Sequence, residues 1–205
     1  MKLKSNTKTV LILLICSLNF TYAHTKECFN KLVNNIATME ADYTQHIYGK
    51  KGKIISVNKG HFMYKYPNLV RWQNTDEEKS LTIHDGNYLW QYEPDLEQVI
   101  KTKSSNEFNG SNPISVLADI TNLRKHFNIQ NIDIAGKSQK FMLSEKDNPK
   151  TKLWLTFNQK ELAKIEYYDN LQNLNELNFA KIEHNNISDK WFTFVPEDNI
   201  DIIEQ

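Results

Sequence analysis

Alternation of apolar and polar residues is the strongest pattern in this chain, and it predicts a protein built mainly from β-strands. The clearest case is the stretch from His84 to Val99. Asp85-Gly86 indicates a tight turn, because glycine accepts the positive φ that short hairpin loops need. The strand after the turn carries three rings on one face, Tyr88, Trp90 and Tyr92. An isolated hairpin cannot bury that much apolar area, so these rings need a partner sheet, a covering helix or an apolar ligand.

Similar alternation predicts some ten or more strands along the rest of the chain. Gly60 and its neighbours Asn58-Lys59 look like a hairpin turn between two of them. Short connections between the early strands favour antiparallel pairing. The expected strand segments are 41–48, 53–57, 60–66, 69–73, 81–83, 88–92, 96–101, 127–134, 141–144, 151–157, 161–168, 174–183 and 191–195.

Two segments have the helical period instead. Thr25 can cap a first helix, on which Cys28, Leu32 and Ile36 form one stripe. Asn112-Pro113 reads as the N-cap and first-turn proline of a second helix that continues to Arg124-Lys125. A twisted sheet of this size curls, and the helices can then cover its concave side. The predicted fold is mainly β with α: a curved antiparallel sheet forming an unclosed barrel under a helical lid.

The N-terminus predicts export. Lysines precede an apolar run from Val10 to Phe20, and Ala23 ends a plausible cleavage site, as in a secretory signal peptide. We therefore expect a signal peptide over residues 1–23 and a single domain over 24–205. Residues 1–23 hold three lysines and no acid, so their removal changes 25 basic and 25 acidic residues to 22 and 25, a net charge of −3. That balance does not indicate a nucleic acid or an anionic membrane surface as partner.

Cysteine usage allows no disulfide in the mature chain, because Cys16 falls within the signal peptide and leaves Cys28 alone. Ile15 before Cys16 is too bulky for a typical lipoprotein acylation site. Cys28 lies on the apolar stripe of the first helix and is interpreted as a buried thiol.

The sequence lacks the patterns of common enzyme classes. It has no G-x-S-x-G elbow, no P-loop, no dinucleotide fingerprint and no histidine pair at zinc-hydrolase spacing. We therefore predict no catalytic residue, no metal and no cofactor. A cavity formed by a curled sheet and rich in aromatic residues is the better hypothesis, although aromatic residues on strands more often form a core.

Several motifs resemble the LolA family of periplasmic outer-membrane lipoprotein carriers, and together they span about Phe29 to Ile203. The segment from His84 to Val99 is similar to the family's D-G-K-x-L-W-x-Y-x-P-x-x-E-Q pattern. The shorter matches are Tyr43-Thr44-Gln45, Gly60 through Trp72, Asn112-Pro113, and Phe192-Thr193-Phe194 with Pro196.

This resemblance implies a monomeric periplasmic chaperone with an apolar cavity under a movable lid. Such a carrier takes acylated lipoproteins from an inner-membrane ABC transporter and delivers them to an outer-membrane receptor. The sequence departs from the family at Tyr66, where an arginine that holds the lid is usual, and at Val70, where an aromatic residue is common. A phenol donates one hydrogen bond and cannot replace the fork of a guanidinium.

Strand alternation and the resemblance suggest which side chains meet the lipid. The expected lid residues are Ile114, Leu117 and Ile120. The expected cavity residues are Tyr64, Tyr66, Val70, Trp72, Leu81, Ile83, Trp90, Leu153, Leu155 and Phe157. Because register decides which face of a strand points inward, a shift by one residue would invert a strand's contribution. An acylated receptor of the LolB type, a periplasmic sensor domain on the same fold, and an enzyme remain as alternatives.

Overall fold

One continuous sheet runs through the computed structural model of the chain, which describes residues 27–76, 79–104, 113–196 and 200–205. The predicted signal peptide, Cys16 and Thr25 lie outside the described residues. The strands are β1 (Thr38–Tyr48), β2 (Ile54–Lys65), β3 (Leu69–Asn74), β4 (Ser80–His84), β5 (Tyr88–Glu93), β6 (Gln98–Lys103), β7 (Phe127–Ala135), β8 (Ser138–Glu145), β9 (Lys152–Asn158), β10 (Glu161–Tyr168), β11 (Leu174–Glu183) and β12 (Asp201–Glu204).

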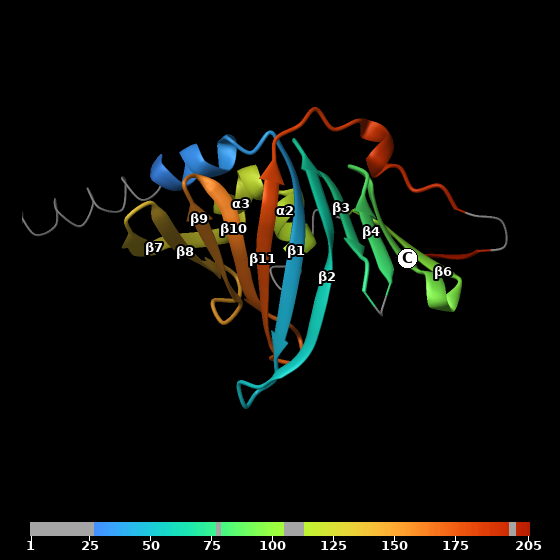
Figure 1. The fold of residues 1–205 in the computed structure, drawn as a ribbon, viewed down its shortest axis with the longest axis horizontal. Coiled ribbons are helices and arrows are strands. Elements are labelled where there is room, and N and C mark those ends of the chain that lie inside the picture. The colour runs from blue at the N-terminus through green and yellow to red at the C-terminus, as the bar shows by residue number, and fades with distance from the viewer. Residues whose placement is uncertain (1–26, 77–78, 105–112, 197–199) are drawn as a thin grey trace, which may run out of the picture.

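The strand order is β12-β6-β5-β4-β3-β2-β1-β11-β10-β9-β8-β7. Every pairing is antiparallel except that of β12 with β6, which is parallel. The two outermost strands, β7 and β12, are not paired with each other, so the sheet curves without closing (Figure 1). The predicted class, an unclosed antiparallel barrel with helices, is confirmed.

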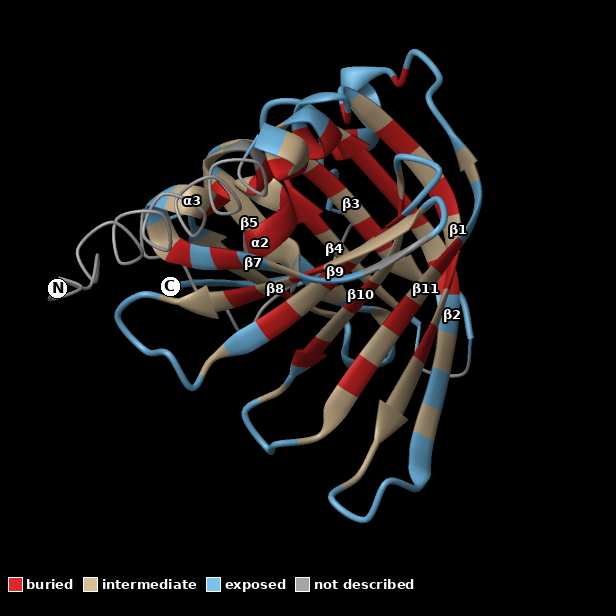
Figure 2. Ribbon diagram, turned by 90° about the vertical axis from the view of Figure 1, so that its left-hand side faces the viewer, coloured by how far each residue is buried: buried red, intermediate tan, exposed pale blue. Residues whose placement is uncertain are grey.

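The helices lie within the curve of the sheet (Figure 2). The described part of the first helix covers residues 27–34. The second helical region consists of α2 (Pro113–Ala118), the 3-10 turn η2 (Ile120–Asn122) and α3 (Leu123–His126). Among the described residues, no helix has the length and apolar character needed to cross a bilayer.

The expectation of one uninterrupted second helix is wrong. Asp119 leaves helical geometry, with φ −121° and ψ 31°. Asn122 donates its backbone N–H to the Asp119 carbonyl (2.9 Å) and its side-chain amide to the Asp119 carboxylate (2.8 Å). Short polar side chains of this kind offer the backbone local alternatives to helical hydrogen bonds, so the region divides into three short pieces.

The expected turn at Gly60 is also wrong, because β2 passes straight through it. A Cβ atom at Gly60 would lie 1.9 Å from the carbonyl oxygen of Gln73 and 2.8 Å from the Tyr43 hydroxyl. Glycine is therefore required here by the close approach of β3. The segments 53–57 and 60–66 merge into the single strand β2. The hairpin turn lies before it, between β1 and β2, where Gly49 donates its N–H to the Lys53 carbonyl (2.9 Å).

The C-terminal segment crosses the outer face of the sheet. The strand expected at 191–195 is absent, and a 3-10 turn, η3 (Asp189–Phe192), occupies its start. Phe194 stacks on Trp90 with ring centroids 5.4 Å apart and meets Tyr92 edge-on at 5.7 Å. The aromatic face of β5 is thus covered by this segment, which packs side chains onto the sheet instead of extending its hydrogen-bond ladder.

Candidate functional site

The candidate site is the apolar interior between the concave face of the sheet and the helices. Figure 2 shows buried positions alternating along the strands that curve around α2. Ring pairs connect the first helix to the far strands, with Phe29 5.1 Å from Phe141 and 6.4 Å from Phe157. On the other side Phe62 lies 5.9 Å from Trp72 and 5.2 Å from Phe179. These side chains form one continuous buried cluster.

Most of the predicted cavity and lid residues meet in this interior cluster. Among the strand residues they are Tyr64, Val70, Trp72, Leu153, Leu155 and Phe157. Leu117 and Ile120 are buried in the same cluster, at 2% and 1% exposure, and Ile114 packs against its edge. The helical pieces therefore cover the concave face through apolar contacts.

Four predicted residues are placed elsewhere. Val70 pairs with His84 across β3 and β4, which turns Leu81 and Ile83 toward the opposite face. Trp90 pairs with Ile83 and shares that outer face. There they pack with Met63, Ile187 and Phe192 in a second cluster. Tyr66 is 57% exposed, and its hydroxyl has no hydrogen-bond partner among the described residues.

The register between strands explains this difference. It places Leu81, Ile83 and Trp90 on the outer face, whereas Val70 and Trp72 point into the interior. Alternation within each strand was assigned correctly, but the pairing between strands decides which alternate set points inward. The outer cluster receives its cover from the C-terminal segment, about a hundred residues later in the chain, which no local pattern reveals.

Sequence reasoning also missed several interior aromatic residues. Phe29, Phe62, Phe141 and Phe179 are all buried in the interior cluster. Phe62 could have been found, since it lies two positions before Tyr64 and therefore on the same face of β2. Cys28, beside Phe29, is half-buried and donates its thiol to the Gln139 side-chain oxygen at 2.9 Å.

The interior is kept free of charge. The phenols of Tyr43, Tyr64 and Tyr167 are neutral at physiological pH, and burial raises the pKa of each further. Trp72 donates its indole N–H to the Tyr43 hydroxyl at 2.7 Å, and the same hydroxyl bonds Asn74. Such an interior suits neutral, apolar chains.

A buried polar group marks one end of the interior. Gln45 donates to the Asn175 side-chain oxygen at 2.8 Å, and both residues are more than nine-tenths buried. Asn58 in turn donates to Gln45 at 3.3 Å. The Tyr43-Thr44-Gln45 motif pointed to this strand, but only the structure shows that its glutamine closes the interior toward the β1–β2 hairpin.

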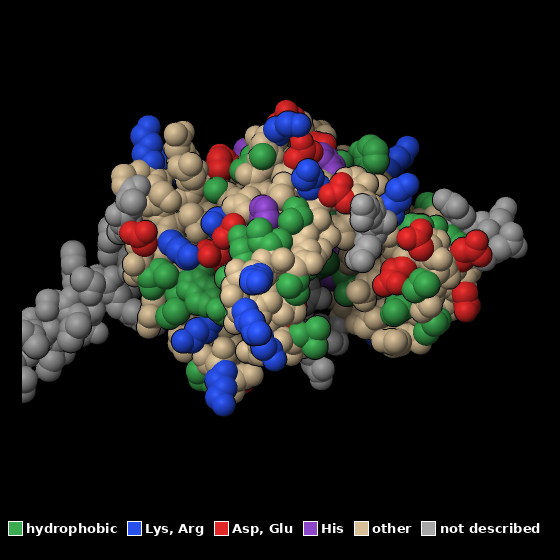
Figure 3. All heavy atoms as spheres, turned by 60° about the horizontal axis from the view of Figure 1, so that its bottom comes forward, with side chains coloured by type: hydrophobic (Ala, Val, Ile, Leu, Met, Phe, Trp, Pro, Cys, Tyr) green, Lys and Arg blue, Asp and Glu red, His purple; other side chains and the backbone are tan. Residues whose placement is uncertain are grey.

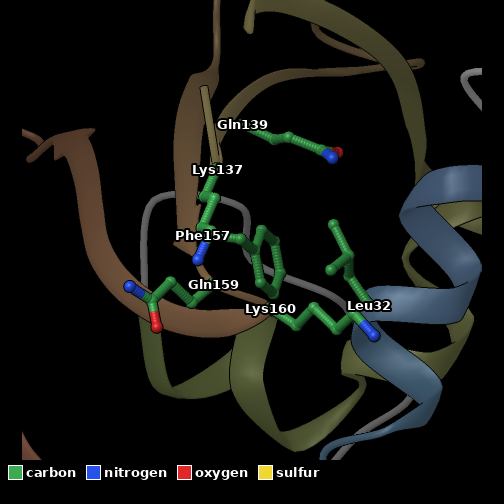
Figure 4. A pocket seen from close by; sticks show the side chains of 6 residues that line it. All are labelled: Leu32, Lys137, Gln139, Phe157, Gln159 and Lys160. Atoms are coloured by element: carbon green, nitrogen blue, oxygen red, sulfur yellow. The ribbon is translucent and has the colours of Figure 1, made fainter. Parts of the chain in front are cut away.

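A pocket of about 400 Å³ lies where the interior meets the surface (Figure 4). It lies between the first helix and the turns that follow β7 and β9. Phe157 and Leu32, both interior residues, form its apolar floor. Lys137, Gln139, Gln159 and Lys160 complete its lining. This volume falls within the range of small-molecule sites.

Titratable side chains of the described residues form no metal-binding group of three or more His, Cys, Asp or Glu. His61, on the outer face, contacts Glu40 at 3.0 Å and Asp42 at 3.2 Å. His84 is buried, with its Nδ1 2.7 Å from the Asn68 carbonyl oxygen, which accepts, and its Nε2 2.8 Å from the Ser104 hydroxyl. The chemistry that the interior supports is therefore the burial of apolar groups.

Comparison with known proteins gives one matching family. The family model described as "Outer membrane lipoprotein carrier protein LolA" matches residues 34–195. Two relatives named outer-membrane lipoprotein carrier protein match nearly the whole chain. That of Nitrosomonas europaea is 27% identical over 95% of this chain and 96% of its own. That of Legionella pneumophila strain Corby is 28% identical over 97% and 99%.

Solved structures share the fold. An uncharacterized conserved protein from Thermus thermophilus superposes with a TM-score of 0.55 at 8% identity, covering 88% of this chain and 98% of the other. A LolA superfamily protein from Nitrosomonas europaea gives a TM-score of 0.48 at 14% identity, over 83% and 98%. At 8% identity the similarity to the Thermus thermophilus protein supports the fold alone. The TM-score of the Nitrosomonas europaea protein is too low to support any further conclusion.

Proposed function

The chain belongs to the LolA family of outer membrane lipoprotein carrier proteins, and from this we propose that it is a periplasmic chaperone for acylated lipoproteins. In this proposal the lipid chains enter the apolar interior under α2 and α3. The protein receives them from an inner-membrane ABC transporter and delivers them to an outer-membrane receptor. The observation that carries the proposal is an uncharged apolar interior, covered by short helices, in a chain that matches the family over residues 34–195.

Lid side chains pack directly against those of the sheet, so lipid entry between them requires the lid to move. Val116, Leu117, Ile120 and Leu123 are each about 1–2% exposed. Burial of such side chains stabilises by about 1.5–3 kcal/mol each, which gives roughly 6–12 kcal/mol for the four. Ten methylenes of an acyl chain contribute about 8 kcal/mol when buried. Lid closure and lipid binding are therefore of similar size, and a carrier whose lid competes with its cargo can release that cargo.

The end of α3 is tied to the sheet by hydrogen bonds. The ammonium group of Lys146 donates to the carbonyl oxygens of Arg124 (2.6 Å) and Lys125 (3.2 Å), and these bonds tie the end of α3 to the β8–β9 turn. Tyr66 donates its backbone N–H to the carbonyl of Ala37, just before β1, at 2.8 Å. This hydrogen bond does not involve α2 or α3. We propose that α2 moves while α3 stays anchored, and that the side chain of Tyr66 does not lock the lid.

Native mass spectrometry of the exported protein with a triacylated lipoprotein tests the proposal. A soluble one-to-one complex is the expected result, whereas precipitation of the lipoprotein in the presence of the protein contradicts carriage. The exposed variant Leu96→Ser, in the turn after β5, provides a control that should bind like the unmodified chain, because Leu96 is 63% exposed.

Two further measurements separate the proposal from its alternatives. Metabolic labelling with a fatty acid would mark a receptor of the LolB type, which is itself acylated, and should leave this protein unlabelled. N-terminal sequencing of the exported protein should begin at His24 if the signal peptide is cleaved after Ala23.

A further inference from the structure

The hairpin between β1 and β2 extends beyond the neighbouring turns of the sheet (Figures 1 and 2). Its strands are among the longest of the fold, at 11 and 12 residues. The turn is tight: Gly52 has φ +71° and donates its N–H to the Gly49 carbonyl at 2.8 Å. The tip is therefore a firm projection at the end of the molecule opposite the first helix.

Apolar side chains at this tip are left in solvent. Ile54 is 52% exposed, Ile55 is 61% exposed and Val57 is 43% exposed. The pairing of β1 with β2 is irregular here, with Tyr48 opposite Ile54 and Ile47 opposite Ser56, so the two isoleucines lie beside a bulge at the tip. On the neighbouring β10–β11 turn, Leu171 is 72% exposed and Tyr168 is 44% exposed.

Positive charge surrounds these apolar side chains. Lys50, Lys51 and Lys53 stand in and beside the turn, and all three are exposed. None of them takes part in an ion pair with another described residue. Lys150 and Lys152, on the β8–β9 turn at the same end, line a second pocket with Trp154 and Tyr168. Figure 3 shows this end of the molecule, with lysines projecting beside apolar side chains.

Two acidic groups of the adjoining β10–β11 region have partners within the fold, whereas Asp147 on the β8–β9 turn is exposed. Asp169 accepts the backbone N–H groups of Leu171 and Asn173, at 2.9 Å each. Glu176 pairs with Lys164 at 3.1 Å. Because the three hairpin lysines have no ion-pair partner among the described residues, their charge can meet an external anionic partner, which the net charge of the chain did not indicate.

We propose that the tip of the β1–β2 hairpin, residues Lys50 to Val57, docks on the surface of a phospholipid bilayer that contains anionic lipid. Lysines near an anionic leaflet are attracted to its negative surface potential, and exposed isoleucines insert at the boundary between headgroups and acyl chains. The tight turn already exposes the lysines and the isoleucines, so docking does not require the hairpin to unfold. Docking is reversible, because three lysines and a few apolar side chains are far from a permanent anchor.

Vesicle flotation tests this inference with the exported protein and phosphatidylcholine vesicles, with and without phosphatidylglycerol. We expect binding only when phosphatidylglycerol is present, and weaker binding as salt is added. Replacing the three hairpin lysines (Lys50→Glu, Lys51→Glu and Lys53→Glu) should weaken binding by about a hundredfold, from about fivefold per lysine. Absence of binding by the unmodified protein would overturn the proposal.

Matched variants separate docking from general electrostatics. Lys103→Glu, Lys125→Glu and Lys190→Glu together change the net charge equally at exposed positions away from the hairpin. This triple variant should keep most of the binding; an equal loss in both triple variants would contradict a hairpin site. Ile55→Ser should weaken binding, whereas Leu96→Ser, at a similarly exposed position, should not. Lipoprotein carriage is measured separately, so failure of vesicle binding leaves the proposed carrier function untouched.

Discussion

At the scale of single residues, roles in this protein depend on close contacts that residue type alone does not reveal. Gly60 and His84 illustrate this. Glycine is common in turns, but Gly60 lies within β2, where the backbone of β3 approaches it closely. Histidine is a common catalytic residue type, but His84 is buried and forms hydrogen bonds with Asn68 and Ser104.

Replacing Gly60 by alanine should destabilise the protein strongly. The new Cβ would meet the Gln73 carbonyl oxygen at 1.9 Å, which forces the backbones of β2 and β3 apart. We expect the free energy of unfolding in urea to fall by about 3 kcal/mol. Gly49→Ala is the control, since its Cβ would meet the exposed Ile55 side chain at 3.2 Å and no backbone atom closer than the Lys53 carbonyl oxygen at 3.9 Å. Equal stability of the two variants would contradict this explanation.

His84 should make the protein less stable in acid. Burial lowers the pKa of His84 in the folded state, an effect that the hydrogen bond to Asn68 only partly offsets. As pH falls through about 6.5, the unfolded chain takes up a proton before the folded one does, so the free energy of unfolding decreases. His84→Gln should therefore show a smaller loss of stability between pH 7 and 5.

His184 should have the opposite effect, which provides a comparison. The Thr38 carbonyl, and after it Glu161, raise the pKa of His184 in the folded state. Its stabilisation is present in acid and is lost as pH rises through that pKa. His184→Gln should therefore increase the loss of stability on acidification, and urea titrations across this pH range measure both variants. A change of the same sign in the two variants would contradict the assignment.

At the scale of elements, the helices depend on the sheet more than on their own propensity. The pieces α2 and α3 contain six and four residues, which is too short for stability in isolation. Contact with the concave face therefore keeps them helical. An element held this way can open locally while the strands stay intact.

Leu117→Ala should loosen the lid selectively. Loss of a buried leucine side chain costs about 2–5 kcal/mol, and on α2 this cost should fall mainly on lid closure. Hydrogen exchange should accelerate in residues 113–118 more than in the strands, and uptake of an apolar fluorescent probe should rise. Leu143→Ala, from an equally buried position on β8, should lower global stability instead. Identical exchange profiles would argue against a lid that moves separately.

At the scale of the whole molecule, the sheet carries apolar clusters on both faces. The concave cluster lies under the helices, and the outer cluster of Met63, Ile83, Ile187 and Phe192 lies under the C-terminal segment. Lys65 fastens that segment by donating to the Ile187 carbonyl at 2.8 Å and pairing with Asp189 at 2.6 Å. The two faces can therefore serve different purposes, one for cargo and one for stability.

Phe192→Ala should test this separation. Removal of a fully buried phenylalanine should lower the free energy of unfolding by about 3–5 kcal/mol. Lipoprotein carriage by the protein that remains folded should not change, because Phe192 lies on the face away from the interior. Trp191→Ala, at a half-exposed neighbour above Arg71, should cost about 1 kcal/mol or less. Loss of carriage by folded Phe192→Ala would show that the outer face also takes part in binding.

The sequence by itself determined the fold class, most strand positions and the hairpin at Asp85-Gly86, because alternation and turn chemistry are local properties. It also carried the family motifs, from Tyr43 to Phe194. Alternation also placed several of the interior residues, such as Val70, Trp72 and Phe157, on the apolar face of their strands.

Only the tertiary structure decided which face of each strand lies inside. The pairing of Val70 with His84 turned Ile83 and Trp90 outward, and a distant segment covered them. It also decided that Gly60 lies in a strand and that the second helix breaks at Asp119. These outcomes depend on contacts between residues far apart in the chain, and a one-residue change of register would reverse them without altering any local pattern.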